Sequence, residues 1–180
     1  IQADRHYVRM VNDKAFERVT GYFKDGNIIY GGRTDAATRF IEPTLIENVP
    51  LDSPLMTEEI FGPVFPIVTF EDNFKERVIE FVTSREKPLA FYYFGKESDG
   101  WEIIRRTSSG GGCINDVIMH IANENVPFGG VGNAGMGRYH DKDSFDAFSH
   151  TRSIIATGTW IDLPFRYMPY KMFGLVKKIL

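Results

Sequence analysis

Apolar residues recur at helical spacing in three stretches of the chain, and this pattern predicts three helices. The stretches are 12–25, 71–84 and 98–107. Asn12 or Asp13 would cap the first helix, and Ser98 or Asp99 the third, because short polar side chains accept hydrogen bonds from the free amides of a first turn. Residues 143–150 indicate a further, short helix.

Short apolar runs between these stretches predict strands. The runs are 27–32, 44–49, 63–70, 88–94, 111–115 and 152–160. The first is expected to be buried, and the fourth, PLAFYYF, is apolar throughout, as in a strand buried on both faces of a sheet. Between residues 63 and 115, strands alternate with helices through short connections, which predicts a parallel sheet with right-handed crossovers. The predicted fold class is therefore α/β.

Length and composition are those of a soluble globular protein. The 180 residues are enough for one domain with a sizeable core, and 43% of them are hydrophobic against 25% charged. No apolar run reaches the roughly 18 residues of a membrane span, and the first residues lack the apolar stretch of a signal peptide. A single cysteine excludes an internal disulfide and fits a reducing, cytoplasmic compartment. The net charge of −3 gives no reason to expect nucleic acid as a partner.

Residues 163–180 carry four cations and no acid, whereas the rest of the chain is acidic. The cations are Arg166, Lys171, Lys177 and Lys178. A basic end of this kind is solvated, contacts another subunit or binds anionic lipid. An apolar set at helical spacing accompanies it, although Gly174 weakens a helix: Met172, Phe173, Val176, Ile179 and Leu180. We expect this tail to dock on protein rather than on a membrane.

The segment SSGGGCINDVIMH, residues 108–120, holds the only cysteine of the chain near a carboxylate and an imidazole. Cys113, Asp116 and His120 could serve a cysteine hydrolase if the stretch were helical and the thiol activated. The glycines and apolar neighbours instead indicate a strand, in which a free cysteine behaves as a small apolar residue. We expect a structural Cys113 and keep a hydrolase that uses Cys113 and His120 as an alternative.

Two further segments are candidates for ligand binding. The glycine-rich segment 127–140 could cradle a phosphate, but it opens no convincing helix and lacks the Lys-Ser or Lys-Thr pair of a P-loop, so a tight surface loop is favoured. In MTEEIFGPV, residues 56–64, an acid pair precedes an aromatic residue and a Gly-Pro turn. Most such pairs are solvated, but one carboxylate could accept both ribose hydroxyls of a dinucleotide. The histidines show no metal-binding spacing, so we expect no metal.

Five segments in this order resemble the aldehyde dehydrogenase superfamily, and most closely its class 3 branch, which includes the fatty aldehyde dehydrogenases. They are EEIFGPV, REKPLAFYYF, SSGGGCINDVIMH, PFGGVGNAGMGRYH and FDAFSHTRS, and GGRTDAATRFIEPTLI fits the same branch. The resemblance covers about residues 5–155. It implies a three-layer, parallel-sheet catalytic domain with a bridging strand and an extended tail. We expect residues 1–150 to belong to that domain and residues 151–180 to form the strand and tail.

The resemblance also implies that much of such an enzyme lies outside these residues. A family subunit is more than twice as long. Its amino-terminal portion holds a Rossmann-like cofactor domain, an oxyanion-stabilising asparagine and a general-base glutamate, followed by the nucleophilic cysteine of a Gly-Gln-x-Cys segment. No Gly-Gln dipeptide occurs in this chain. The chain resembles the carboxy-terminal part of the catalytic domain, with no catalytic residue of its own, and we expect it to be inactive alone.

For ligand binding, the resemblance implies Glu59 as the carboxylate that holds the nicotinamide ribose of NAD or NADP, and Phe61 as the residue packed near the nicotinamide. It implies an aldehyde channel lined by Ile118, Ile121 and Ala122, whose apolar side chains suit aliphatic or aromatic aldehydes. The expected activity is oxidation of aldehydes to carboxylic acids, in a homodimer bridged by the last predicted strand. A non-catalytic interaction module is the alternative.

Overall fold

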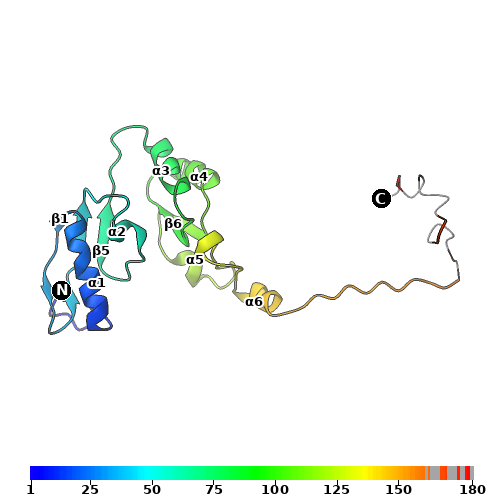
Figure 1. Ribbon diagram of the computed structural model, residues 1–180, viewed down its shortest axis with the longest axis horizontal. Coiled ribbons are helices and arrows are strands. Elements are labelled where there is room, and N and C mark those ends of the chain that lie inside the picture. Colours follow the sequence, from blue (N-terminus) through cyan, green and yellow to red (C-terminus); the bar gives the residue numbers. More distant parts are fainter. Residues whose placement is uncertain (161, 163–166, 170–173, 175–176, 179–180) are drawn as a thin grey trace. The chain divides into compact units, whose positions relative to one another are not determined.

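A three-stranded sheet is the centre of residues 1–84 in the computed structural model (Figure 1). Its strands, in the order β1–β4–β5, are Asn27–Tyr30, Thr44–Glu47 and Val64–Ile67. β1 runs antiparallel to β4, and β4 runs parallel to β5. A separate hairpin consists of β2, Thr34–Asp35, and β3, Phe40–Ile41. The start of β4 directly after Pro43 agrees with the sequence, because proline cannot donate to a strand ladder.

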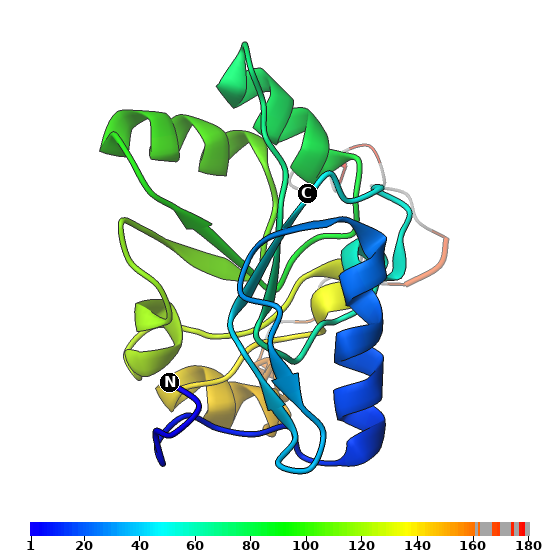
Figure 2. The same cartoon turned by 90° about the vertical axis from the view of Figure 1, so that its left-hand side faces the viewer.

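The helix formed by residues 13–21 lies along the strands of this unit (Figure 2). The helices are α1, Asp13–Gly21, continued by the 3₁₀ turn η1, Tyr22–Asp25, then α2, Pro54–Thr57, and α3, Phe74–Thr83. Asn12, one of the two predicted caps, accepts a hydrogen bond from the amide of Ala15 at 2.8 Å. Val19 and Tyr22 pack with Ile46 of β4 in one buried cluster. The apolar face predicted from helical spacing is therefore the face that α1 buries.

The second unit, residues 85–180, is built on a parallel strand pair. The strands are β6, Ala90–Tyr93, and β7, Gly111–Ile114, and α4, Glu97–Arg106, connects them. Three short elements follow: α5, Met119–Ala122, η2, Gly132–Ala134, and α6, Asp141–Ala147. Parallel strands joined through a helix in this unit, together with the parallel pair β4–β5, confirm the predicted α/β class.

The structure describes residues 1–160, 162, 167–169, 174 and 177–178. The apolar set predicted for the tail, Met172, Phe173, Val176, Ile179 and Leu180, lies outside the described residues. Within the described part, none of the helices has the length and apolar character needed to cross a membrane. The predicted boundary between residues 1–150 and 151–180 stays a prediction.

One expectation about burial was wrong. β5 pairs in parallel with β4, and β6 pairs in parallel with β7, so each parallel pair lies within its own unit; a single sheet running through residues 63–115 stays a prediction. β1 is exposed rather than buried, because it is the edge strand of its sheet, where apolar side chains have a neighbour on one side only. The 180 residues also form two units where their length suggested one domain.

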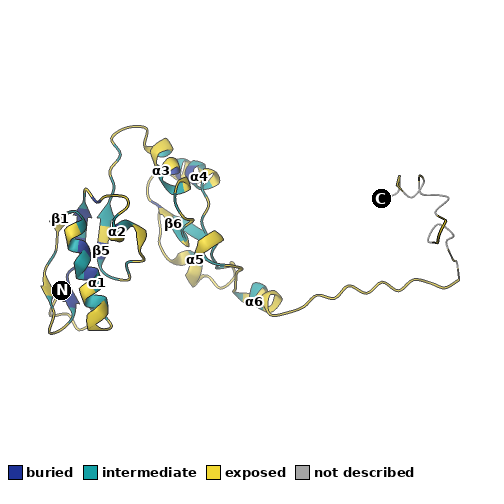
Figure 3. Cartoon of the chain, viewed as in Figure 1, coloured by how far each residue is buried: buried dark blue, intermediate teal, exposed yellow. Residues whose placement is uncertain are grey.

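Two local expectations also need correction (Figure 3). The run PLAFYYF is not buried on both faces: Tyr93 is buried, but Tyr92 and Phe94 are exposed. The N-cap of α4 is Lys96, which has an extended backbone, so Ser98 and Asp99 fall inside the first turn. Residues 152–160 form no strand within the described part of this chain, and Ile155 is 89% exposed; a strand that these residues form with another subunit stays a prediction.

Candidate cofactor and aldehyde site

The acid pair of the EEIFGPV motif lies in the short segment that connects α2 to β5. Glu58 ends α2 with an extended backbone, and Phe61 adopts a left-handed conformation with φ of +43°. Such a backbone is strained for an aromatic residue and persists only where the surroundings hold it. At the far end of the segment, the Pro63 carbonyl accepts a hydrogen bond from the amide of Thr44 at 2.8 Å, which fixes the start of β5.

Arg18 of α1 holds the middle of this segment. Its guanidinium donates to the carbonyl of Glu59 at 3.1 Å and to the carbonyl of Ile60 at 2.8 Å. It also donates to the Tyr22 hydroxyl, one helical turn along, and lies 5.5 Å from the centroid of that ring. The sequence interpretation missed Arg18; its position beside the apolar Val19 in the predicted helix was the one signal in the sequence that could have found it.

Gly62 brings the segment against the same helix. A Cβ atom at this position would lie 2.7 Å from Cγ1 of Val19, so only glycine permits the approach. Val19 is fully buried in the core cluster. The segment is therefore fixed to α1 by hydrogen bonds from Arg18 and by direct packing at Gly62.

The two acids of the pair have different surroundings. The Glu58 carboxylate accepts a hydrogen bond from the Tyr22 hydroxyl at 2.8 Å. Burial, then this bond to Glu58, raises the pKa of Tyr22, and Arg18 partly opposes the change. The Glu59 side chain is exposed, and its carboxylate has no bonded partner among the residues that the structure describes. Both side chains are exposed, and among the described residues only the Glu58 carboxylate accepts a hydrogen bond.

Phe61 stands at an open, largely apolar cavity of about 670 Å³. Its side chain is 76% exposed, and the cavity is also lined by Tyr7, Met10, Ile41 and Pro63. An exposed aromatic ring beside an apolar hollow is suited to cover a flat ligand group. The structure therefore presents Glu59 and Phe61 from one braced segment, both toward solvent.

The predicted aldehyde-channel residues lie in and before α5, in the second unit. Ile121 and Ala122 line a cavity of about 690 Å³ together with Tyr139 and His140. Ile118 precedes α5 in a left-handed conformation with φ of +68° and is 58% exposed, but it does not line that cavity. Two of the three residues thus share a cavity.

The structure brings Cys113 and His120 together but leaves Asp116 apart. The Cys113 sulfur lies 3.7 Å from Nδ1 of His120, whereas the Asp116 carboxylate accepts from the amide of Val117. Nε2 of His120 is buried without a hydrogen-bond partner among the described residues. A thiol–imidazole nucleophile needs a third group to orient the imidazole, and none bonds this ring in the described part of the chain.

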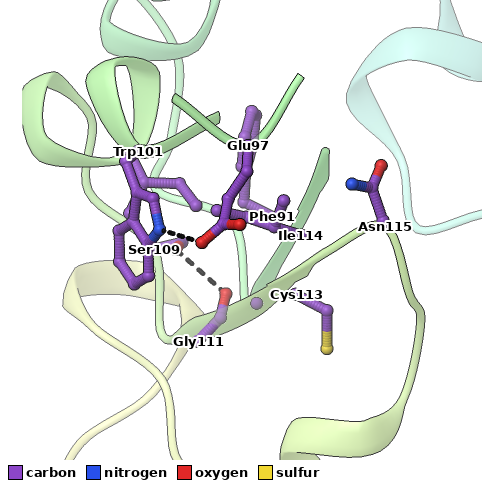
Figure 4. A pocket seen from close by; sticks show the side chains of 10 residues that line it. Phe91, Glu97, Trp101, Ser109, Gly111, Cys113, Ile114 and Asn115 are labelled. Atoms are coloured by element: carbon purple, nitrogen blue, oxygen red, sulfur yellow. Dashed lines mark hydrogen bonds between the residues drawn. The ribbon is translucent and has the colours of Figure 1, made fainter. Parts of the chain in front are cut away.

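Figure 4 shows a cavity that Cys113 helps to line, with its sulfur directed away from the labelled side chains of Trp101 and Glu97. This cavity, about 670 Å³, lies between α4 and β7 and is lined by Trp101, Glu97 and Ile114 among others. Trp101 donates to the Glu97 carboxylate at 3.1 Å within α4. Cys113 is itself one of the residues that line this cavity, and its role as a structural cysteine stays a prediction.

The glycine-rich segment forms a tight loop. Two of its amides bond to carbonyls within the segment, Ala134 to Val131 and Gly135 to Gly132. The bridge between Phe128 and Tyr139 closes the loop. In the described residues, no three His, Cys, Asp or Glu side chains gather in a way that could hold a metal ion.

Comparison with known proteins places these features in one family. Residues 3–154 match the model of the aldehyde dehydrogenase family. The chain is 44% identical over 174 residues to 4,4'-diaponeurosporen-aldehyde dehydrogenase of Staphylococcus aureus, covering 95% of this chain and 38% of that protein. It is 46% identical over 168 residues to the dimeric NADP-preferring aldehyde dehydrogenase of Canis lupus familiaris, covering 92% of this chain and 37% of that protein.

The fold agrees with the sequence match. A solved structure described as the substrate-bound state of Staphylococcus aureus AldH matches 99% of this chain and 40% of its own, with a TM-score of 0.85 and 43% identity. The chain thus spans well under half the length of these relatives. Because both sequence and fold match over nearly all of the chain, it belongs to the aldehyde dehydrogenase family.

Proposed function

We propose that this chain is the carboxy-terminal part of the catalytic domain of an aldehyde dehydrogenase that oxidises aldehydes to carboxylic acids with NAD or NADP. In this proposal Glu59 and Phe61 hold the nicotinamide end of the cofactor, and Ile118, Ile121 and Ala122 form a wall of the aldehyde channel. The observation that carries it is the exposed Glu59 carboxylate, which has no bonded partner among the described residues, on a segment that hydrogen bonds hold at the Glu58 side chain and at the carbonyls of Glu59 and Ile60.

The residues present fit the cofactor. A carboxylate with no other described partner can accept hydrogen bonds from two ribose hydroxyls. The Phe61 ring, exposed at an apolar cavity, can cover one face of a flat heterocycle. When bound, the nicotinamide supplies the acceptor for the hydride of the aldehyde. The contribution of this chain is then to orient the ring, because transfer depends on close alignment of the reacting atoms.

The aldehyde side would be formed by α5 and the loop that follows it. Ile121 and Ala122 offer apolar surface in a cavity that His140 and Tyr139 also line. The apolar side chains of Ile121 and Ala122 would exclude water from an aliphatic or aromatic aldehyde. The nucleophile and general base belong, in this proposal, to the part of the family fold that this chain does not match.

The test uses a complete enzyme made by joining this chain to the amino-terminal part of the Staphylococcus aureus relative. We expect the joined enzyme to reduce NAD or NADP with an aldehyde, and Glu59→Gln to slow hydride transfer more than aldehyde capture. Loss of one charge-assisted hydrogen bond costs about 1.5–3 kcal/mol. Single-turnover absorbance of the reduced cofactor measures the step.

Glu17→Gln is the matched control, because Glu17 is an exposed acid of the same unit, on α1. Hydride transfer at the normal rate in Glu59→Gln would remove Glu59 from the site. A folded joined enzyme without any aldehyde oxidation would contradict the proposal as a whole and favour the non-catalytic module.

We also propose a homodimer as the working assembly, with residues 152–160 as the bridging strand. These residues expose Ile154 and Ile155 and pair with no described strand of their own chain, which leaves their backbone free to pair with another. Light scattering of the joined enzyme measures the assembly, and Ile155→Pro should convert it to monomers, because proline cannot donate to a ladder.

A further inference from the structure

We propose that Arg18 is a positioning residue for the cofactor, acting through the backbone of Glu59. This inference rests on the proposed function of Glu59. Arg18 lies 41 residues away in sequence, on a different element, and its two terminal nitrogens bond the two consecutive carbonyls that precede Phe61. Those bonds fix the two peptide planes that flank Ile60, namely Glu59–Ile60 and Ile60–Phe61, and hence the directions in which Glu59 and Phe61 project.

The second support is a relay that fixes Arg18 itself. Its guanidinium donates to the Tyr22 hydroxyl, and that hydroxyl donates to the Glu58 carboxylate at 2.8 Å. Tyr22 is only 3% exposed and belongs to the core cluster, so it can hardly move. The relay starts in the core and ends on both sides of Glu59, because Glu58 precedes it and Ile60 follows it.

The chemistry of the relay explains the division within the acid pair. Glu58 neutralises the relay and is held by it, so it is not free for a ligand. Glu59, one residue on, is turned outward because its carbonyl points back to Arg18. A planar guanidinium can reach two carbonyls and a hydroxyl at once, whereas the ammonium group of lysine is a point charge without that fixed fork. The geometry therefore requires arginine rather than any cation.

A role in stability alone is the competing explanation. Gly62 against Val19 and Pro63 with Thr44 already fix the end of the segment next to β5. Arg18 fixes only the part that carries Glu59 and Phe61. Its removal should thus misdirect these two side chains while the strand behind them stays in place. A misplacement of about 1 Å can cost on the order of 100-fold in rate.

The test compares Arg18→Ala, Arg18→Lys and Tyr22→Phe in the joined enzyme. We expect single-turnover hydride transfer to fall roughly 10- to 100-fold in Arg18→Ala and less in Arg18→Lys, with the KM for the cofactor raised and that for the aldehyde little changed. Guanidinium ion added to Arg18→Ala should restore part of the rate. Tyr22→Phe, which removes only the hydroxyl, is the mildest variant and should lose roughly threefold.

Arg33→Ala is the matched control for stability. Arg33 is another arginine of the same unit and bonds to a buried acid, Glu42; in the described part of the chain, no hydrogen bond links it to the segment 58–63. The Arg33→Ala variant should lower the Tm without changing the rate of hydride transfer, and added guanidinium ion should not alter that rate. A normal rate and a normal cofactor KM in Arg18→Ala, together with a lowered Tm, would show that Arg18 is structural only.

The double variant Arg18→Ala/Glu59→Gln separates this inference from the proposed function. If Arg18 acts through Glu59, the double variant should be little slower than Glu59→Gln alone. Full additivity of the two losses would overturn the inference and leave Glu59 as the ribose ligand. Slow hydride transfer in Glu59→Gln together with a normal rate in Arg18→Ala would also overturn the inference and leave Glu59 as the ribose ligand. A normal Glu59→Gln would overturn the proposed function itself.

Discussion

The two segments proposed to face ligands are supported in different ways. The segment around Glu59 rests on a cluster of buried side chains within residues 1–84, which includes Val19, Tyr22 and Ile46. The segment around Ile121 belongs to a unit in which, among the described residues, only Tyr93 and Ile103 are buried apolar side chains. Aromatic residues of that second unit stay exposed, such as Phe94 at 64%.

This difference teaches that the segment around Glu59 is positioned by the core of its own unit, whereas the segment around Ile121 has few buried apolar side chains in its unit to support it. Apolar surface of this extent normally packs against another domain or subunit. Hydride transfer needs a closely fixed ring, which suits the braced segment, whereas an aldehyde channel needs only apolar walls. In the proposed function, the segment that the core holds is thus the one whose ligand needs the closer alignment.

The largest expected effect tests the cores directly. Ile46 and Ile103 are both fully buried, one in each unit. Replacing a buried isoleucine with alanine lowers the free energy of unfolding by about 2–5 kcal/mol. We expect Ile46→Ala near the upper end of this range. Ile103→Ala should cost less, because few of its neighbours are buried and they can move to fill the cavity. Urea unfolding measures both. Trp101 and Trp160, the only tryptophans, report on the second unit, and hydrogen exchange reports on the first. Equal costs would contradict the difference between the units.

A pH effect should appear in the first unit. Two hydrogen bonds from the Arg33 guanidinium lower the pKa of Glu42, whose side chain anchors the β2–β3 hairpin. A lowered folded pKa contributes stability that is complete above the unfolded value of about 4.3 and is lost as the pH falls through the folded value. The denaturant midpoint of the first unit should therefore drop in acid.

Glu42→Gln should remove most of this acid-dependent loss and lower stability at neutral pH. Asp35→Asn is the control, because the pKa of Asp35 is also lowered, chiefly by its bond from Thr38, but its carboxylate has no ion-pair partner among the described residues. An unchanged acid profile in Glu42→Gln would assign the effect to other carboxylates.

The smallest effect is expected at Cys113. Cys113→Ala exchanges one small, half-buried residue for another, so it should cost about 1 kcal/mol or less and leave aldehyde oxidation by the joined enzyme intact. Iodoacetamide should label the folded chain slowly and the unfolded chain fast. His120→Ala serves as the comparison, since it removes the neighbour at 3.7 Å. Rapid native labelling that His120→Ala abolishes, with lost activity in Cys113→Ala, would revive the thiol nucleophile.

Much of the local structure could be predicted from the sequence. The Asn12 cap, the end of the first helical segment before Gly26, the start of β4 after Pro43 and the crossover from β6 through α4 to β7 all follow from patterns within a few residues. Side-chain periodicity, capping and the missing proline amide act within one element, so they are written in consecutive residues. The motif order also indicated the family and the acid pair.

The sequence alone determined the elements and the segment that carries the acid pair, but only the tertiary structure decided which acid is free. That choice depends on Arg18 and Tyr22, which meet residues 58–60 because α1 packs on the sheet. The tertiary structure also determines three other features: the pairing of β5 with β4, the exposure of β1 and the contact of Cys113 with His120. They depend on which distant segments come together, and that is set by burial of the whole apolar surface rather than by any local pattern.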